Sequence, residues 1–326
     1  MNIVLVHGWA SDCRTWEPLL GGLEGIANVS TVNLSDFDPF EKHLCETQLN
    51  SLADEIAAQL PSRCVLLGWS LGGMLAVNIA ARHPEKVTSL ITLASNVCFT
   101  ARDQWQSAME PSVFQQFYAA CEDNEPQTLK RFCGLSAQGD ERERAILKIL
   151  RARLPAANDA SPRQNLDWLS VLNALDNREH FSQLKMPGLH LFGAGDALVP
   201  AVVGRDIAAL NEKQTTVVIP GVCHAMHWSK PECVLTHVLE FLEAQRFHLD
   251  KMRVAESFSK AAATYDTVAQ LQRDVGDHLF LEHLPMTGGV STLVDLGCGT
   301  GCFTEKLQTR FPSADVVGLD IAQGML

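Results

Sequence analysis

A long uncharged run, residues 64–81, is the feature that most constrains how this chain folds. At its centre the sequence GWSLGG places Ser70 between Gly68 and Gly72. The run is long enough to cross a membrane as one helix. Glycines two residues before and after a serine instead indicate a sharp strand-to-helix turn, which exposes the hydroxyl at the carboxyl end of a strand. The run therefore predicts a buried strand, a serine at the turn and a helix that begins at Leu71.

Short apolar runs alternate with helix-like segments along the first part of the chain. The strand-like runs are residues 3–6, 29–34, 64–68, 87–94, 189–196 and 215–220, and the helix-like segments are residues 43–60, 71–83, 201–210 and 231–245. This alternation predicts an α/β fold with a mostly parallel sheet and helices on both faces. A helix-like stretch at about 100–182 interrupts the pattern. Because ligands bind at the carboxyl ends of such strands, we expect an insertion there to form a lid.

The rest of the chain begins a second α/β unit. A helix-like stretch reaches about residue 284, and the runs TLVDLGCGTG and ADVVGLDIA then flank another helix. We expect one domain at 1–246 and the first part of a second at 252–326. One strand–helix–strand unit cannot cover a parallel sheet on both faces, so no separate activity is expected of this part alone.

Composition excludes several classes of function. The net charge of −12 argues against general nucleic-acid binding, which needs a basic surface. The ten cysteines are spread singly, without zinc-like spacing, so neither a metal site nor a disulfide scaffold is expected. The first residues, MNIVLVHGWA, lack the features of a signal peptide, and the cytoplasm is the expected location. The sequence leaves the oligomeric state undetermined.

A nucleophilic serine needs a base, and the base needs a carboxylate to orient it. In folds with this turn the three follow the order serine, acid, histidine. Asp196 is the best acid, because it lies in the loop GAGDALVP directly after a strand. Asp167 and Asp176 are weaker candidates because they lie within the helical insertion.

Two histidines compete for the role of base. His224 and His227 both follow the last strand, in the segment IPGVCHAMHW. We favour His224, which lies nearer the end of that strand. The other histidine is then an ordinary loop residue.

An ester carbonyl under attack needs two N–H donors for its developing negative charge. The backbone N–H of Leu71 is expected to supply one. The loop after the first strand should supply the other, with Trp9 as the expected donor. His7 in the same loop is expected to brace it rather than to act as a second base.

The predicted lid is basic although the whole chain is acidic. Residues 126–155 contain seven basic and three acidic side chains. Arg144, Lys148 and Arg151 recur at helical spacing, and with Arg142 they either attract an acidic partner or form a solvated helix face. The aromatic residues of the lid either line an acyl pocket or form its core: Phe114, Phe117, Tyr118 and Phe132.

The run DLGCGTG in the second unit lies between a strand and a helix. Gly297, Gly299 and Gly301 would let the backbone approach a ligand closely. Asp295 opens the run, and Asp320 follows the next strand, where it could take a ribose hydroxyl pair. The alternatives are a nucleoside-binding site and a turn that needs glycine only for packing.

These motifs carry a family resemblance. HGW at residues 7–9, GWSLGG, GAGDALVP and GVCHAMHWSKPE resemble the α/β-hydrolase superfamily and, within it, the pimeloyl-carrier-protein methyl ester esterases, over about residues 1–245. The segment 254–276 followed by VDLGCGTG resembles the start of the malonyl-carrier-protein O-methyltransferases. The resemblance implies a cofactor-free serine esterase of biotin synthesis that acts on an acyl carrier protein. It also implies a methyltransferase segment that would use S-adenosylmethionine if complete.

Overall fold

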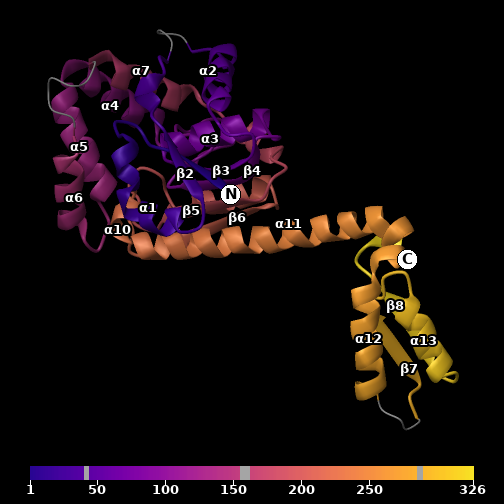
Figure 1. Ribbon diagram of the computed structural model, residues 1–326. Helices are drawn as coiled ribbons and strands as arrows, with labels where there is room; N and C mark the ends of the chain where they lie inside the picture. The colour runs from indigo at the N-terminus through magenta and orange to yellow at the C-terminus, as the bar shows by residue number, and fades with distance from the viewer. Residues whose placement is uncertain (40–43, 155–161, 285–288) are drawn as a thin grey trace. The chain divides into compact units, whose positions relative to one another are not determined.

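A six-stranded parallel sheet forms the centre of the first part of the chain (Figure 1). The strands follow the spatial order β2-β1-β3-β4-β5-β6. They are β1 (Asn2–Val6), β2 (Asn28–Val32), β3 (Cys64–Trp69), β4 (Val87–Leu93), β5 (Gly188–Gly193) and β6 (Gln214–Ile219). Strands β3 and β5 are buried along their whole length, which explains their continuous apolar sequences. The predicted α/β fold with a parallel sheet is confirmed.

The computed structural model describes residues 1–39, 44–154, 162–284 and 289–326, except for the side chains of residues 162–163, 246–250 and 281–282. Within it the chain forms two compact units, Met1–Phe241 and Leu242–Leu326. The division falls inside helix α11 (Pro231–Val268), which continues through the residues where the sequence predicted a boundary. The domain limits at 246 and 252 stay a prediction.

Helices cover both faces of the sheet in the first unit. Figure 1 shows α2 and α3 on one face and α1 with the first part of α11 on the other. The helices around the sheet are η1 (Cys13–Trp16), α1 (Glu17–Glu24), η2 (Leu34–Asp36), α2 (Glu46–Ala58), α3 (Leu71–Arg82), α8 (Arg178–Ser182), α9 (Val203–Leu210) and α10 (Met226–Ser229). The sequence interpretation missed α1, where two glycines lower helix propensity. One of them, Gly22, leaves room for Leu235 of α11, which explains a glycine inside this helix.

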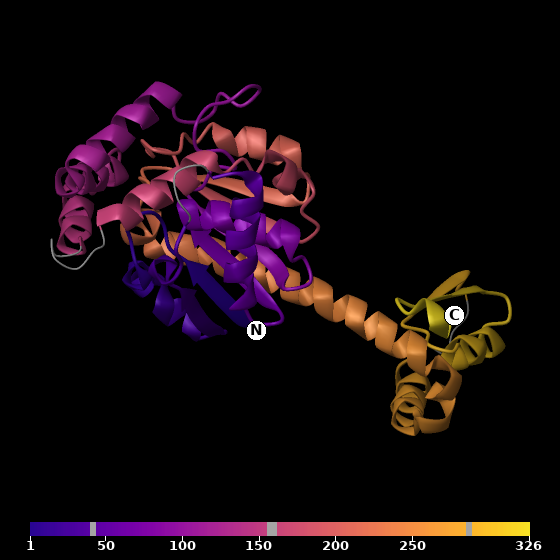
Figure 2. The same cartoon turned by 90° about the horizontal axis from the view of Figure 1, so that it is seen from above.

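The insertion between β4 and β5 is helical, as the sequence predicted. Its helices are α4 (Pro111–Asp123), α5 (Glu125–Ala137), α6 (Glu143–Ala152) and α7 (Pro162–Ala174). Figures 1 and 2 show them gathered at one end of the sheet. Residues 155–161, which the predicted lid also included, lie outside the described residues.

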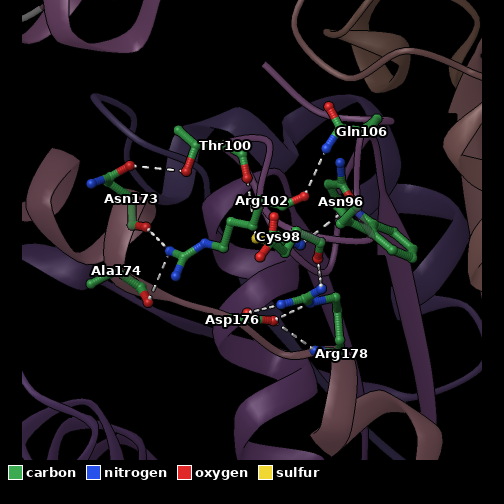
Figure 3. A network of polar contacts seen from close by, with 11 residues as sticks. Asn96, Cys98, Thr100, Arg102, Gln106, Asn173, Ala174, Asp176 and Arg178 are labelled. Atoms are coloured by element: carbon green, nitrogen blue, oxygen red, sulfur yellow. Dashed lines mark hydrogen bonds and ion pairs between the residues drawn. The ribbon is translucent and has the colours of Figure 1, made fainter. Parts of the chain in front are cut away.

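A polar network ties the two stems of this insertion together (Figure 3). Arg102, on the outgoing stem, donates to the backbone carbonyl of Asn173 at the end of α7. Arg178, on the returning stem, pairs with Asp176 at 2.7 Å and donates to the carbonyl of Asp103 at 2.5 Å. Because both stems are fixed next to the sheet, the lid leaves and rejoins it at defined points.

The second unit contains a two-stranded parallel sheet. After α11 it consists of α12 (Gln270–His283), β7 (Thr292–Leu296), α13 (Cys302–Arg310), β8 (Asp315–Leu319) and η3 (Gln323–Met325). This order matches the predicted helix, strand, helix and strand. Across the described parts of both units, the helices are too short or too polar to cross a bilayer.

A buried polar ladder crosses three neighbouring strands of the first unit. On β5, Nδ1 of His190 lies 2.8 Å from the hydroxyl of Thr92 on β4, and Nε2 lies 3.1 Å from Oε1 of Gln214 on β6. The amide oxygen of Gln214 accepts, so Nε2 carries the proton and Nδ1 accepts from Thr92. Burial lowers the pKa of His190 to about 4, and the imidazole is neutral at physiological pH.

Acidification should therefore destabilise the first unit through His190. The unfolded chain takes up this proton near pH 6.5 and the folded chain near pH 4, so stability is complete above pH 6.5 and falls as the pH drops towards 4. At pH 5 the loss from this one residue is about 2 kcal/mol. Urea unfolding followed by tryptophan fluorescence measures it, because all six tryptophans lie in the first unit. His190→Gln should reduce the loss between pH 7 and pH 5 by this amount; an unchanged loss would contradict the assignment.

Candidate active site

Ser70 occupies a strained turn between the buried strand β3 and helix α3. Its backbone has φ 54° and ψ −119°, a conformation that residues other than glycine rarely adopt. Its N–H donates to the carbonyl of Leu93 at 2.9 Å, and its carbonyl accepts from the hydroxyl of Ser95 at 2.8 Å. These bonds stabilise the strained turn. The turn in turn places the Ser70 side chain at the end of β3.

The two flanking glycines are required by close backbone contacts. A Cβ on Gly68 would collide with the carbonyl of Gly72, and a Cβ on Gly72 would collide with the carbonyl of Val6. Gly8, in the loop after β1, also lies close, since a Cβ there would come within 3.3 Å of the Ser70 Cβ. The serine turn is therefore packed directly against the loop that follows β1.

Asp196 and His224 form a buried pair at the ends of β5 and β6. Nδ1 of His224 donates to Oδ2 of Asp196 at 2.8 Å, and both side chains are fully buried. Oδ1 of Asp196 accepts from the N–H groups of Leu198 and Val199 at 2.8 and 2.9 Å, which fixes the carboxylate. Nε2 of His224 is buried and has no hydrogen-bond partner among the described residues. An imidazole whose Nδ1 is held by a carboxylate, with Nε2 left without a partner, has the arrangement of a general base.

His227 is held elsewhere. Its Nε2 lies 2.8 Å from the hydroxyl of Thr15, and its ring packs edge-on against Trp69 with centroids 4.7 Å apart. Burial, together with the neighbouring His224, lowers the pKa of His227 to about 3. The structure thus brings His224, and not His227, to Asp196. The rival acid Asp176 pairs with Arg178 in the lid stem.

The two expected oxyanion donors flank the serine turn. Leu71 is the first residue of α3, so its N–H has no acceptor within the helix. Trp9 lies in the loop after β1, and its indole is fixed by a 2.7 Å bond to the carbonyl of Asn165 in α7. His7 braces this loop from within: Nδ1 donates to the carbonyl of Gly8 and Nε2 accepts from a backbone N–H of η2, both at 2.9 Å. Burial lowers the pKa of His7, which favours this neutral form.

An apolar cavity of about 120 Å³ lies beside Trp9, between the lid and the loop that carries Asp196. Phe114 and Phe117 of α4, Phe132 of α5 and Leu198 are among its lining residues. Of the four lid aromatics that the sequence singled out, three line this cavity, whereas Tyr118 lines a separate open groove. Phe114 is also part of the main core, so both alternatives apply to it.

The basic residues of the lid lie on and beside α6. Arg144, Lys148 and Arg151 are exposed on this helix, and Arg142 at its N-terminus donates to the carbonyl of Ser229 at 3.3 Å. Arg151 also lines an open groove of about 500 Å³ with Gln127, Lys130, Arg131 and Leu154. Arg131 lines the apolar cavity as well, so this basic groove adjoins it.

The glycine loop of the second unit adopts the backbone that its sequence suggested. Gly297, Gly299 and Gly301 have φ of 79°, 55° and 90°, and a Cβ on the first or third would meet no atom within 4 Å. Asp320 reaches this loop, because its Oδ2 accepts from the N–H of Gly299 at 2.9 Å. Asp295 turns instead to α13, where it accepts from a threonine hydroxyl at 2.7 Å. The open loop and a carboxylate beside it fit a nucleoside ligand, while Asp295 supports the loop.

The sequence analysis did not predict which lid residues hold the backbone next to His224. Asp140 accepts from the N–H of Cys223 at 3.2 Å, and the carbonyl of Ser136 accepts from the N–H of Ala225 at 3.2 Å. Both bonds flank His224. In the sequence, Asp140 is only one of the three acidic residues in the charge count of the lid. Its neighbours in sequence do not indicate a partner far along the chain. In the described residues no group of three or more histidine, cysteine or acidic side chains could hold a metal ion.

Comparisons with known proteins agree with this fold. Residues 2–231 match the family model for the alpha/beta hydrolase fold. Among solved structures, a bromoperoxidase from Bacillus anthracis superposes with a TM-score of 0.65 at 18% identity, covering 74% of this chain and 91% of that one. An esterase from Exiguobacterium antarcticum gives 0.63 at 19% identity, covering 74% and 92%. At these identities the structures show the fold alone.

Relatives extend over both units. The biotin biosynthesis bifunctional protein BioHC of Cellvibrio japonicus is 47% identical over 99% of this chain, which spans 63% of that protein. The pimeloyl-[acyl-carrier protein] methyl ester esterase of Pectobacterium carotovorum is 33% identical over 74% of this chain and 94% of its own length. The chain therefore spans about three fifths of the bifunctional relatives and nearly all of the single-function ones.

The two histidines give a direct test of the site. His224→Ala should lower kcat for ester hydrolysis by about 10³-fold or more, because the base is lost. His227→Gln should keep kcat within about tenfold, since its imidazole is neutral and bonded to Thr15. Initial rates on a small chromogenic ester, normalised to folded protein, measure both. A large loss in the second variant with little loss in the first would reverse the assignment.

Proposed function

Because the chain belongs to the alpha/beta hydrolase family, we propose that it is a serine carboxylesterase that hydrolyses the methyl ester of pimeloyl-[acyl-carrier protein] in biotin biosynthesis. The observation that carries the chemistry is the His224–Asp196 pair, joined at 2.8 Å and bonded through the His224 carbonyl to Trp69, the residue before the strained turn at Ser70. The substrate is inferred from relatives of that name, which this chain matches at 33% identity over nearly their whole length. The cytoplasm, where acyl carriers and free thiols occur together, suits a protein whose ten cysteines are all unpaired.

The first half of the reaction forms an acyl-enzyme. Oγ of Ser70 attacks the ester carbonyl carbon while Nε2 of His224 takes the hydroxyl proton. Asp196 keeps the proton on Nδ1 and stabilises the imidazolium. The N–H groups of Trp9 and Leu71 receive the oxyanion. The intermediate collapses as His224 passes its proton to the methoxy oxygen, and methanol leaves.

The second half restores the enzyme. Water enters, His224 takes one of its protons, and the resulting hydroxide attacks the acyl carbon. His224 then returns the proton to Oγ of Ser70, and the carboxylic acid is released. No cofactor takes part in these steps.

Two features of the lid support a carrier-bound acyl chain as substrate. The cavity beside Trp9 is apolar and suits a methylene chain, since burial of each CH₂ is worth about 0.8 kcal/mol. The adjoining groove carries Lys130, Arg131 and Arg151, which suit an anionic arm or an acidic carrier. Arg142, Arg144 and Lys148 extend this basic surface along α6. A generic esterase or thioesterase would need the same triad but not this surface.

The second unit is proposed as the first part of a methyltransferase domain. Gly297, Gly299, Gly301 and Asp320 would hold S-adenosylmethionine, with Asp295 supporting their loop. The cofactor would supply a methyl group to a carboxylate on the carrier. A rival proposal makes the hydrolase unit only a docking module for that activity, but the buried Asp196–His224 pair and the serine of the strained turn favour catalysis.

The substrate assignment is tested with purified pimeloyl-carrier methyl ester. The wild type should release methanol and leave the acyl chain on the carrier, as mass spectrometry of the carrier will show. Ser70→Ala should lower this rate by about 10³-fold or more. Loss of the whole acyl chain would indicate a thioesterase instead, and a wild-type rate in the Ser70 variant would exclude Ser70 as the nucleophile.

Carrier docking is tested by charge reversal on α6. The triple variant Arg144→Glu, Lys148→Glu, Arg151→Glu should lower kcat/KM for the carrier ester by about tenfold or more at low salt and spare a small free ester. Raised ionic strength should slow the wild type on the carrier ester in the same selective way.

A matched control carries the same change of charge at the opposite edge of the sheet. Arg63, Lys185 and Lys213 are exposed residues just before β3, β5 and β6. Reversing these three should leave both substrates near their wild-type rates. Equal losses on the carrier ester in the two triple variants would mean that overall charge, and not this surface, guides the carrier.

A further inference from the structure

Atoms of the lid hold the backbone on both sides of His224. Residues 138–142 connect α5 to α6, and Oδ2 of Asp140 in this connector accepts from the N–H of Cys223 at 3.2 Å. The carbonyl of Ser136, at the end of α5, accepts from the N–H of Ala225 at 3.2 Å. A further bond comes from the sheet, where Nε1 of Trp69 donates to the carbonyl of His224 at 3.0 Å. Two of the bonds that fix this segment therefore depend on the lid.

The surroundings of Asp140 favour its ionised form, which accepts hydrogen bonds. It is only 8% exposed, and its Oδ1 accepts from the N–H of Arg142 at 2.7 Å while Oδ2 accepts from Cys223. Burial alone would raise the pKa of this carboxyl, but its hydrogen bonds outweigh burial and hold the pKa below its usual value. A charged acceptor with two backbone donors makes stronger bonds than a neutral one.

The connector also touches the loop that carries the acid. Gly139 has φ 82°, and its backbone lies so close to that of Gly195 that a Cβ on either residue would collide with the carbonyl of the other. Gly195 directly precedes Asp196, and its N–H donates to the carbonyl of Val222 at 3.0 Å. The connector, the acid loop and the base loop are thus joined in one backbone cluster.

Helix α6 packs on the same segment. Its Ile146 is fully buried in a small apolar cluster with Ala137, Cys223 and Ala225. The two residues next to His224 are therefore held both by hydrogen bonds to the lid and by apolar contact with it.

We propose that Asp140 is a positioning residue that holds the His224 segment, so that Nε2 of the imidazole faces Ser70. This inference rests on the proposed serine-esterase function and concerns the same site. Asp140 reaches His224 through the Cys223 N–H and acts on the base without touching the substrate. Without the Asp140 carboxylate, the N–H of Cys223 loses its acceptor and the His224 segment is held on one side less. The Asp196–His224 hydrogen bond can then form with the imidazole in more than one orientation.

The test uses the full chain and a small chromogenic ester, so that carrier docking plays no part. Asp140→Ala should lower kcat by about 10- to 100-fold with KM changed less than about threefold, because the fault lies in alignment and not in binding. Asp140→Asn keeps the shape but has one acceptor oxygen for two N–H donors, so a smaller loss in the same direction is expected. Glu143→Ala is the matched control: this exposed carboxylate accepts from Gly139 in the same connector at 3.3 Å and should keep the wild-type kcat.

Active-site titration with a serine-directed phosphonate separates alignment from folding. If Asp140 positions the base, every molecule of the variant is labelled, but more slowly, in proportion to kcat. If it only stabilises the fold, fewer molecules are labelled and each reacts at the wild-type rate. That second result, or a wild-type kcat per labelled site in both Asp140 variants, overturns the inference and leaves the proposed function intact. A wild type that neither labels nor hydrolyses the ester overturns the proposed function and the inference with it.

Discussion

The whole site depends on the close backbone packing around Ser70. The turn is strained, and it survives because Gly68 and Gly72 let α3 and the end of β1 come into direct contact. This contact sets the distance between the serine and the loop after β1, and so between the nucleophile and the donor expected at Trp9. Since β3 and its neighbours are buried on both faces, the sheet supplies the rigid frame that holds the turn.

Burial lowers the pKa of His7, His190 and His227 and favours their neutral form, and the partners of each core histidine then decide what it can do. His7 bonds to backbone groups and His190 to two neutral side chains, while His227 bonds to a threonine hydroxyl. Only His224, among these four, has a carboxylate on one nitrogen and no bond on the other in the described residues. A carboxylate partner stabilises the imidazolium that forms during catalysis, whereas burial without such a partner opposes it. The assignment of the base therefore follows from its partner and not from its exposure.

Local patterns in the sequence predicted the strands, the turn at Ser70 and the order of acid and base, because each depends on neighbours within a few residues. The preference for His224 over His227 rested only on its place nearer the end of the strand, because three residues of spacing do not say which ring faces Asp196. Asp140 could not be predicted, because its partner Cys223 lies far along the chain and any acidic surface residue would look the same. The sequence suggested a ribose hydroxyl pair as the partner of Asp320, which stays a prediction. It did not indicate that the oxygens of Asp320 accept from the backbone N–H groups of Gly299 and Ala322 and so shape the glycine loop.

Helix α6 has two roles in the lid. One side of it places Ile146 against the residues flanking His224, and the other exposes Arg144, Lys148 and Arg151 to solvent. A partner that binds the basic side must also bear on the helix that supports the base. In a close-packed interior a shift of α6 cannot be absorbed locally, so it would reach the His224 segment through Asp140 and Ile146. The contacts that align the imidazole therefore make its alignment sensitive to a partner bound on the basic side of α6.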